Sequence, residues 1–257
     1  MISKQKIISP ADSDELKGIL AHACDLYTKS EFSGRAFFTK FLTPADAREI
    51  EMRFPKLSVP LSFFGGYHDA ERLVACFGEV YDNSEYPIRA VMVHQKGGRE
   101  LSHRDYMGTV LSLGIKREMI GDIVVTDDGA YVFCLEEIAD FIADSLIKVG
   151  GAGVSAKVID SPQNIVIERK YEKLSATVSS LRLDCVVSAA TGKSRSASSP
   201  FIGKGLVCVN YKEASSVSMS IKDGDIVSVR GMGKFLIRTD ERLTKKGRIH
   251  VDIYKYV

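Results

Sequence analysis

Tryptophan is absent from this chain of 257 residues, and cysteine is scarce. The five cysteines, Cys24, Cys76, Cys134, Cys185 and Cys208, lie far apart, and no two of them form a C-x-x-C pair. This spacing excludes a zinc cluster and a disulfide framework, so we expect buried thiols in a reducing compartment. No apolar run approaches the roughly 18 residues of a membrane span, and the N-terminus lacks the apolar stretch of a signal peptide. We therefore expect a cytoplasmic protein with no membrane partner.

Complete catalytic and cofactor motifs are also lacking. Gly192-Lys193-Ser194 matches the end of a phosphate-binding loop, but the glycine required five positions earlier is Val187. His103-Arg104-Asp105 matches a kinase catalytic loop without the other kinase signatures, and Gly231-Met232-Gly233 lacks the third glycine of a dinucleotide site. No metal-ligand spacing relates the histidines, which are His22, His68, His94, His103 and His250. We predict that the protein is not an enzyme and has no cofactor and no metal site.

Charge is distributed unevenly along the chain. The net charge of the whole chain is only +2, but residues 181–257 hold 14 Lys and Arg against 7 Asp and Glu, a net charge of +7. The first 180 residues hold 21 Lys and Arg against 26 Asp and Glu, a net charge of −5. A basic module attached to a mildly acidic body is expected to bind polyanions through one end only.

Hydrophobic residues make up 45% of the chain and charged residues 26%, which is enough apolar material for two or three folded domains. We predict an α+β protein with three domains, at 1–71, 72–176 and 177–257. The first is expected to be mainly helical, because Asp12 to Tyr27 carries apolar residues at helical spacing. Thr43-Pro44 then supplies an N-cap and a first-turn proline for a second helix.

Strands and helices alternate in the middle segment. The elements that we expect are strands at 89–94, 123–125, 131–133 and 165–167, a helix starting at Ser102 and a helix over 136–149. Ser102 and Asp105 form a capping box, and Asp127-Asp128-Gly129 is the turn signal of a hairpin. Gly150-Gly151 would close the second helix. This order predicts a compact α+β sandwich with an antiparallel or mixed sheet.

The C-terminal segment carries two short helices followed by strands. Apolar residues from Leu183 to Ala190 mark one face of a helix that stops near Gly192, and a second helix starts at Ser194. On that second helix Arg195, Ser198 and Ser199 are expected to face solvent or a ligand, opposite Ala197 and Phe201. The expected strands lie at 206–210, 217–221, 225–229 and 249–253, the last as a half-buried edge strand.

Four motifs stand in order in this segment: Leu181-Arg182-Leu183-Asp184, Lys193-Ser194-Arg195-Ser196, Gly205-x-Val207-x-Val209-Asn210, and Gly224-Asp225 before an alternating strand. Together they resemble the S-four RNA-binding domain, named after a small-subunit ribosomal protein. In that family two short helices and the following β-turn form one basic surface that binds structured RNA. On this chain the resemblance implies a surface made of Arg182, Lys193, Ser194, Arg195, Ser196, Lys204, Asn210 and Lys212.

Physical chemistry favours this surface. Arg195, at a helix start, can bind a phosphate through its forked guanidinium, while the backbone N–H groups of that helix end offer further donors. The hydroxyls of Ser194 and Ser196 add two more donors. Several weak donors that act together therefore make the site.

Two other residues qualify this interpretation. We interpret Asp184 as structural, because it can pair with Arg182 or with the N-terminus of its own helix. Pro200 departs from the family pattern, since proline inside the second helix removes a backbone donor and clashes with the preceding turn. We expect that helix to be kinked or broken at Pro200.

Three further segments, at 64–67, 103–108 and 113–123, begin Phe-Gly-Gly-Tyr, His-Arg-Asp-Tyr and Leu-Gly-Ile-Lys. With them, nearly the whole chain resembles the YlmH group of bacterial proteins. That group has a helical N-terminal part, a middle part like an RNA-recognition motif (RRM) and a C-terminal S-four domain. The resemblance implies a non-enzymatic, ribosome-associated factor that binds ribosomal RNA and transfer RNA on the large ribosomal subunit. It also implies a role in the rescue of stalled ribosomes and a genetic link to cell division, and we expect a monomer.

Two other functions remain open. Arg182-Leu183-Asp184 also resembles the motif at the catalytic aspartate of RNA pseudouridine synthases, which often carry an S-four domain. In those enzymes, however, the small domain normally precedes a much longer catalytic domain. The second alternative is an adaptor that docks a protein through its N-terminal or middle domain while the basic tail is anchored to RNA.

The middle segment lacks the aromatic residues that an RRM displays on its central strands, since neither 90–93 nor 123–125 contains one. We therefore interpret this segment as a scaffold, or as a protein-binding or shape-reading module. Arg104, Lys116 and Arg117 are the residues that we expect to make a second RNA contact.

Overall fold

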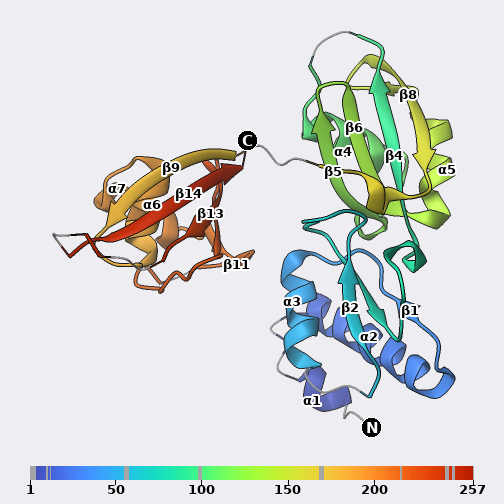
Figure 1. Cartoon of the computed structure of the whole chain (residues 1–257), viewed down its shortest axis with the longest axis horizontal. Helices are drawn as coiled ribbons and strands as arrows, with labels where there is room; N and C mark the ends of the chain where they lie inside the picture. Colours follow the sequence, from blue (N-terminus) through green and yellow to red (C-terminus); the bar gives the residue numbers. More distant parts are fainter. Residues whose placement is uncertain are drawn as a thin grey trace. The chain divides into compact units, whose positions relative to one another are not determined.

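The computed structural model describes residues 4–9, 11, 13–54, 58–97, 100–167, 171–214, 216–240, 243–244 and 247–256. Its helices and antiparallel sheets confirm the predicted α+β class. The chain forms two compact units, Met1–Ile167 and Glu168–Val257, coloured from blue to yellow and from golden yellow to red in Figure 1. The division of the chain into three domains stays a prediction.

The N-terminal part of the first unit combines three helices with a small sheet. Its elements are α1 (Lys4–Ile8), α2 (Asp14–Ser33), β1 (Phe37–Phe38), α3 (Pro44–Arg53), β2 (Leu61–Phe64) and β3 (Val74–Phe77), with the strand order β1-β3-β2. Thr43 caps α3 ahead of Pro44, as predicted. Tyr27 of α2 is buried together with Ile50 of α3 and Phe77 of β3, so this helix packs on both neighbours. The prediction of a mainly helical segment did not include the sheet.

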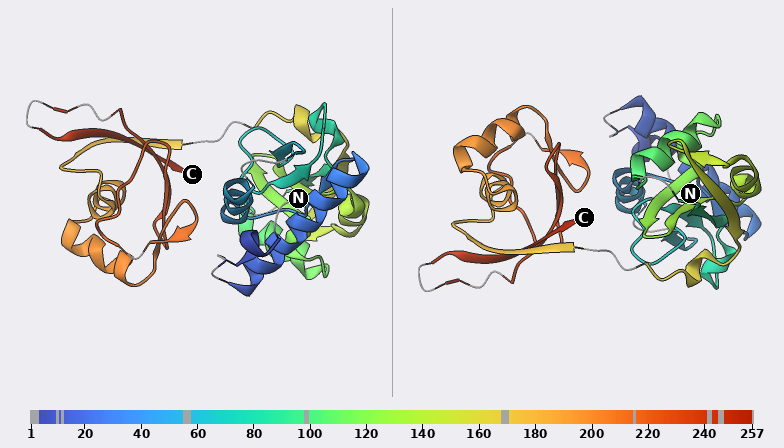
Figure 2. Two further views of the ribbon diagram at one scale, coloured as in Figure 1. Left: turned by 90° about the horizontal axis from the view of Figure 1, so that it is seen from below. Right: turned by 90° about the horizontal axis from the view of Figure 1, so that it is seen from above.

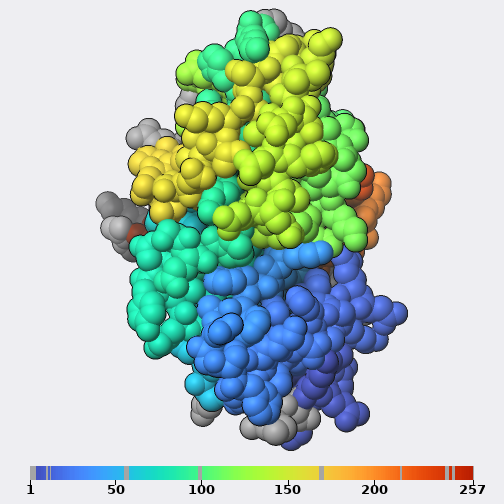
Figure 3. Space-filling view, turned by 90° about the vertical axis from the view of Figure 1, so that its right-hand side faces the viewer, coloured from blue at the N-terminus to red at the C-terminus, as the bar shows by residue number. Residues whose placement is uncertain are grey.

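An antiparallel sheet of five strands forms the rest of the first unit. The strands are β4 (Ile88–Gln95), β5 (Ile120–Thr126), β6 (Gly129–Leu135), β7 (Lys148–Val149) and β8 (Ala152–Ile159), in the order β5-β6-β4-β8-β7. The helices are α4 (His103–Ser112) and α5 (Glu136–Ser145), with short 3-10 helices at Asn83–Glu85, Arg117–Met119 and Pro162–Asn164. Val110 of α4 and Ile142 of α5 pack in one core with Val91 and Val132 of the sheet, so both helices cover the same face. Figure 3 shows the yellow-green α5 on the surface of this unit.

The predicted hairpin and capping box are confirmed. The strands β5 and β6 pair across the turn, with Val124 opposite Tyr131. At the start of α4 the backbone N–H of Ser102 donates to the Asp105 carboxylate at 2.9 Å. Local sequence signals therefore located both features correctly.

Three other predictions for this segment are wrong. The helix expected over 136–149 ends at Ser145, and Val149 belongs to β7. Gly150-Gly151 has positive φ at both residues and makes the turn from β7 to β8. Paired glycines suit a hairpin turn as well as a helix end, which explains the error. Residues 165–167 form no strand; Ile165 and Ile167 pack instead beside the sheet, while Val166 is exposed.

The second unit is a curved sheet of six antiparallel strands with two helices on one face (Figure 2). The strands are β9 (Tyr171–Val178), β10 (Val207–Val209), β11 (Lys212–Glu213), β12 (Ile226–Val229), β13 (Gly233–Arg238) and β14 (Ile249–Tyr256), in the order β11-β10-β12-β13-β14-β9. The helices are α6 (Leu183–Thr191) and α7 (Arg195–Gly203). Val187 of α6 and Ile202 of α7 share a core with Phe235 and Ile253 of the sheet.

The strand prediction for this unit is right in part. Strands expected at 206–210 and 225–229 are present as β10 and β12. The prediction of an edge strand near the C-terminus is wrong, because β14 lies between β13 and β9. Residues 217–221 form no strand, and the carbonyl of Met219 instead accepts the N–H of Leu183 at 2.8 Å. The strands β9 and β13 were not expected, since β9 is mostly exposed and lacks a buried alternating pattern.

A half-buried carboxylate joins the two sheets of the first unit. Asp122 of β5 accepts hydrogen bonds from the Tyr67 hydroxyl at 2.8 Å and from the backbone N–H groups of Glu71 and Arg72 at 2.7 and 3.2 Å. The Tyr67 ring stacks on Phe133 of β6, with ring centroids 4.6 Å apart. Two of the segments that carry the family resemblance, 64–67 and 113–123, therefore meet at Asp122.

Two arginines share this joint. Arg72 and Arg117 both donate to the backbone carbonyl of Ile120, at 3.0 and 2.6 Å. Burial lowers the pKa of Arg72 to about 10, and the nearby charge of Arg117 acts in the same direction while Asp122 opposes it. The Asp122 carboxylate therefore stabilises the positive charge of two partly buried arginines.

We predict that Asp122→Asn destabilises the first unit by about 3 kcal/mol, because the amide cannot accept all three hydrogen bonds and the substitution removes a negative charge that acts on both arginines. Hydrogen–deuterium exchange of the full chain should become faster at 61–77 and 117–135. Asp140→Asn, at an exposed position of α5, is the matched control and should leave both segments unchanged. Unaltered exchange in Asp122→Asn would contradict the role of this carboxylate as the joint.

Candidate RNA-binding surface

The helix α6 begins against the loop that precedes β12. The N–H groups of Leu183 and Asp184 donate to the carbonyls of Met219 and Val217 at 2.8 and 3.1 Å. Asp184 lies in the first turn of α6, where its carboxylate also accepts the N–H of Cys185 at 3.0 Å. A carboxylate in this position is stabilised by the positive end of the helix dipole, which confirms the structural role expected of Asp184.

A short turn joins α6 to α7 and exposes the basic motif. Gly192 ends α6 with a left-handed φ of 68°, and Ser194 caps α7 by accepting the N–H of Ala197 at 3.2 Å. Lys193 lies between them and is exposed. The hydroxyls of Ser194 and Ser196 are 3.0 Å apart. The turn therefore presents an ammonium group and two hydroxyls at the N-terminus of α7.

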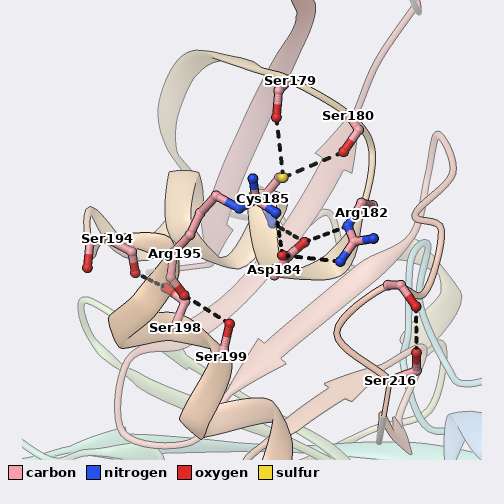
Figure 4. A network of polar contacts seen from close by, with 11 residues as sticks. Ser179, Ser180, Arg182, Asp184, Cys185, Ser194, Arg195, Ser198, Ser199 and Ser216 are labelled. Carbon is pink, nitrogen blue, oxygen red and sulfur yellow. Dashed lines mark hydrogen bonds and ion pairs between the residues drawn. The ribbon is translucent and has the colours of Figure 1, made fainter.

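Two arginines converge on Asp184, as Figure 4 shows. Nη2 of Arg195 donates to Oδ2 of Asp184 at 2.6 Å, and Nε of Arg182 donates to Oδ1 at 3.2 Å. The Asp184 side chain is only 7% exposed, whereas those of Arg195 and Arg182 are 52% and 43% exposed. We name these three residues the Asp184 triad. The pairing with Arg182 was predicted, but the pairing with Arg195, which ties α7 to α6, was not.

The two guanidinium groups control the ionisation of the carboxylate. Burial acts to raise the pKa of Asp184, but hydrogen bonds from Arg195 and Arg182 outweigh burial and lower the pKa to about 2. The contact with Asp184 in turn raises the pKa of Arg195. Asp184 is therefore ionised at neutral pH, and the triad carries a net charge of one positive unit.

This arrangement is suited to binding an anion. A guanidinium has five N–H donors in a rigid fork, and the two forks of the triad remain about half exposed; Lys193, two residues before Arg195, is exposed as well. Phosphate oxygens match such forks in a bidentate geometry. Because Asp184 already holds both side chains in place, little conformational entropy is lost when an anion binds.

The polar side of α7 differs from the prediction. Ser198 is fully buried and its hydroxyl donates to the carbonyl of Ser194 at 3.0 Å, whereas Ala197 is exposed. The hydroxyl of Ser199 donates to the backbone carbonyl four residues earlier, at 3.0 Å. Ile202, one helical turn after Ser198, is the apolar anchor of this side, so it directs Ser198 into the core. Ser198 therefore does not face a ligand.

Pro200 does not break α7, so one of the two expected outcomes is wrong, while a kink at Pro200 stays a prediction. The helix continues through Pro200 to Gly203. The N–H of Lys204 donates to the Pro200 carbonyl at 3.1 Å and closes the last turn. Proline has no N–H to give to the carbonyl of Ser196, so one helical hydrogen bond is missing without loss of the helix.

The other residues of the predicted surface lie on other elements. Lys204 follows the end of α7, nine residues or about 13 Å from its start, and Lys212 is exposed on β11. Asn210 has a left-handed φ of 48° in the β10–β11 turn. Its side chain donates to the Asp225 carboxylate at 2.8 Å and accepts the N–H of Ile226 at 3.0 Å. Asn210 therefore holds the turn, and the structure does not join it to the triad.

The three residues expected to make a second RNA contact in the middle segment also differ in their surroundings. Arg104 and Lys116 are exposed. Arg117 instead donates to the carbonyls of Ile120 and Gly121, and burial lowers its pKa. Its guanidinium serves the interior of the first unit.

Aromatic residues do stand on a central strand of the middle sheet, at Tyr131 and Phe133 of β6. The strand at 131–133 was expected from the sequence, but its two aromatic residues were not among the expected RNA contacts. Phe133 is fully buried beneath the stacked ring of Tyr67. The chain itself therefore covers the Phe133 ring, whereas Tyr131, beside the same cluster, is partly exposed.

Within the described parts of the chain, no group of His, Cys, Asp and Glu side chains could hold a metal ion. The helices described there include none with the length and apolar character needed to cross a membrane. The five cysteines are free thiols, and burial raises the pKa of Cys134 to about 12.

Comparison with known proteins places the chain among relatives. Residues 83–163 match a family described as "Putative RNA-binding domain in YlmH". The chain is 32% identical over 221 residues to "Ribosome-associated protein quality control protein P2" of Bacillus subtilis (strain 168), which covers 84% of this chain and 86% of the relative. The chain belongs to the YlmH family. A solved structure, "Cell division protein ylmH from Streptococcus pneumoniae", is 23% identical with a TM-score of 0.48, over 58% of this chain and 93% of that chain.

The YlmH match falls on the middle segment. Residues 83–163 span the five-stranded sheet from β4 to β8 together with α4 and α5. The description of that family as RNA-binding therefore concerns the segment that we interpreted as a scaffold or as a protein-binding or shape-reading module. The Asp184 triad lies outside the matched residues.

We predict that Asp184→Asn destabilises the second unit by about 1–2 kcal/mol at pH 7, a value reduced by solvent screening of the half-exposed arginines. Because the folded pKa is lowered, the carboxylate stabilises the unit above about pH 4, and this contribution is lost as the pH falls toward 2. The measurement is urea unfolding of the full chain, followed by NMR signals of residues 181–205. The difference in free energy of unfolding between the parent chain and Asp184→Asn should be equal at pH 7 and pH 5 and smaller at pH 3.

The exposed pair of Asp223 and Arg238, 3.3 Å apart, provides the control. Asp223→Asn should cost less than about 1 kcal/mol, as exposed ion pairs do. A difference between Asp184→Asn and the parent chain that persists undiminished at pH 3 would contradict the assignment.

Proposed function

We propose that this protein is a non-enzymatic, ribosome-associated RNA-binding factor and that the α6–α7 surface of its second unit binds structured RNA. The observation that carries the proposal is the Asp184 triad, in which one buried carboxylate holds two half-exposed guanidinium groups. The excess of positive charge over residues 181–257 would attract the RNA backbone to this unit. The residues that we assign to RNA are Arg182, Lys193, Ser194, Arg195 and Ser196, with Lys204 and Lys212 at the margin.

The family relationship supports the ribosome as the place of action. The B. subtilis relative is named for ribosome-associated quality control, and the matched family for RNA binding. We propose on this basis that the chain acts in the cytoplasm, as a monomer, on the large ribosomal subunit. There it would contact ribosomal RNA and transfer RNA during the rescue of stalled ribosomes. A link to cell division, which the name of the S. pneumoniae protein carries, belongs to the same proposal.

We predict that Lys193→Ala and Arg195→Ala each weaken association with purified large ribosomal subunits. If each side chain contacts a phosphate, each substitution should lower the slope of log K against log salt by about 0.7–0.9. Cosedimentation at a series of salt concentrations measures both quantities. Lys193→Ala isolates the charge effect because Lys193 is exposed in a turn, whereas Arg195→Ala also opens the triad.

The control for these variants is Lys29→Ala, which removes an exposed lysine from α2 in the first unit. This substitution should leave the affinity for the subunits unchanged. Equal affinity and equal salt slope in Lys193→Ala, Arg195→Ala and the parent chain would overturn the proposed surface.

A pseudouridine synthase is the enzyme alternative, and the surroundings of Asp184 argue against it. A catalytic aspartate must reach its nucleotide, but the Asp184 side chain is 7% exposed and its oxygens accept bonds from Arg182, Arg195 and Cys185. We therefore predict no isotope release from uridine-labelled RNA by either the parent chain or Asp184→Asn. Release that depends on Asp184 would establish the enzyme instead.

An adaptor is the second candidate function. Phe141 on α5 and Ile147 just after it are both exposed, and large apolar side chains at the surface are typical of protein contacts. Capture of a partner protein that survives nuclease treatment would favour this alternative over binding through RNA alone.

A further inference from the structure

The outer face of the sheet in the second unit differs from the face that α6 and α7 cover. Residues alternate between the two faces along each strand. Val251 and Ile253 of β14 are buried in the core, while Tyr254 and Tyr256 point the other way and are partly exposed. In the described parts of β9, β13 and β14, no outward position is buried.

Three tyrosines meet on this outer face. In the register of the sheet, Tyr171 of β9 lies opposite Tyr256 of β14. The ring of Tyr171 is 5.1 Å from that of Tyr256 and 6.0 Å from that of Tyr254, edge to face in both cases. Tyr171 is 38% exposed. We name these residues the Tyr171 cluster; edge-to-face packing orients its rings and leaves aromatic surface open to solvent.

Lysines stand over two of these rings. Nζ of Lys234 is 4.5 Å from the ring centroid of Tyr256, and Nζ of Lys173 is 5.4 Å from that of Tyr254. These distances are within the range of cation–π attraction. Aromatic surface and positive charge are therefore interleaved within one patch.

The patch has an excess of positive charge. The outward positions of β9, β13 and β14 carry Lys173, Lys234 and Arg238, against one carboxylate, Asp252. Asp252 pairs with Lys173 at 2.9 Å, and Asp223 pairs with Arg238 at 3.3 Å, so the excess amounts to one positive charge, that of Lys234. Lysine is depleted in protein–protein interfaces, whereas cations alternating with exposed aromatic rings suit a polyanion that carries flat bases.

We propose that this outer sheet face binds single-stranded RNA, with a base stacked on the Tyr171 cluster and phosphates at Lys173 and Lys234. The proposal rests on RNA as the ligand of this chain and adds a second site to it. The α6–α7 surface would hold structured RNA, and the opposite face of the same unit would hold an unpaired segment. Stacking of bases on sheet aromatics, with the backbone at nearby cations, is a general mode of single-strand recognition.

The test compares two labelled RNA probes on the full chain by fluorescence anisotropy, a ten-nucleotide oligouridylate and a stable hairpin. Tyr171→Val keeps a strand-forming residue at the sheet edge but removes the ring. It should weaken oligouridylate binding roughly 5- to 100-fold and leave hairpin binding unchanged. Tyr171→Phe keeps the ring and should bind both probes like the parent chain. Tyr81→Val, which removes an 88% exposed tyrosine from the first unit, is the matched control.

Intrinsic fluorescence gives an independent reading, because a chain without tryptophan emits through tyrosine alone. Oligouridylate should quench this emission, and Tyr171→Phe should reduce the quenching while it preserves affinity. Lys193→Ala should act in the opposite sense to Tyr171→Val, weakening the hairpin and sparing the oligouridylate.

The outcomes separate the two sites. If oligouridylate does not bind, or binds to Tyr171→Val as tightly as to the parent chain, the sheet-face proposal is overturned and the α6–α7 surface is untouched. If Tyr171→Val loses a protein partner but keeps the oligouridylate, the face is a protein site and the proposal is equally overturned. If Lys193→Ala leaves hairpin binding intact while Tyr171→Val weakens the oligouridylate, the α6–α7 assignment fails and the sheet face stands.

Discussion

The second unit depends on a carboxylate that is removed from water while its two partners are not. Asp184 is buried at the start of α6, and the arginines that neutralise it reach it from the N-cap of α6 and from α7. If either guanidinium were absent, a buried charge would be left poorly compensated, which is costly in a protein interior. The relative placement of the two helices and the direction of both forks are therefore set by one electrostatic requirement.

The first unit also places a carboxylate beside two arginines, but there the arginines are not available to a ligand. Asp122 also accepts hydrogen bonds from backbone N–H groups and lies beside two arginines. Arg72 and Arg117, however, donate their hydrogen bonds to backbone carbonyls of their own unit. Their charge stabilises a joint between two sheets. In the second unit the guanidinium groups stay about half exposed. The difference between a structural arginine and one available to a ligand thus lies in what surrounds the group.

Short-range signals in the sequence predicted much of this structure. Thr43 before Pro44, the capping box at Ser102, the hairpin turn at 127–129 and the α6–Gly192 end all occur where the residue chemistry demanded them. Errors arose where tertiary contacts decide. Ser198 is buried because Ile202 anchors that side of α7, and β9 is a strand because β14 pairs with it. The contact of Arg195 with Asp184 and the meeting of Tyr171 with Tyr256 join residues whose proximity no periodicity encodes.

The pairing of β9 with β14 also bears on how the second unit folds. These strands enclose the segment that contains α6, α7 and the other strands, and a hydrogen bond between them joins Ser175 to Asp252, 77 positions away. Closing a loop of that length costs chain entropy before any native contact repays it, so this pairing is expected to be a slow and late step. The Tyr171 cluster exists only after that step, because its rings come from both strands. A copy whose folding stops earlier could form its two helices and still lack the aromatic face altogether.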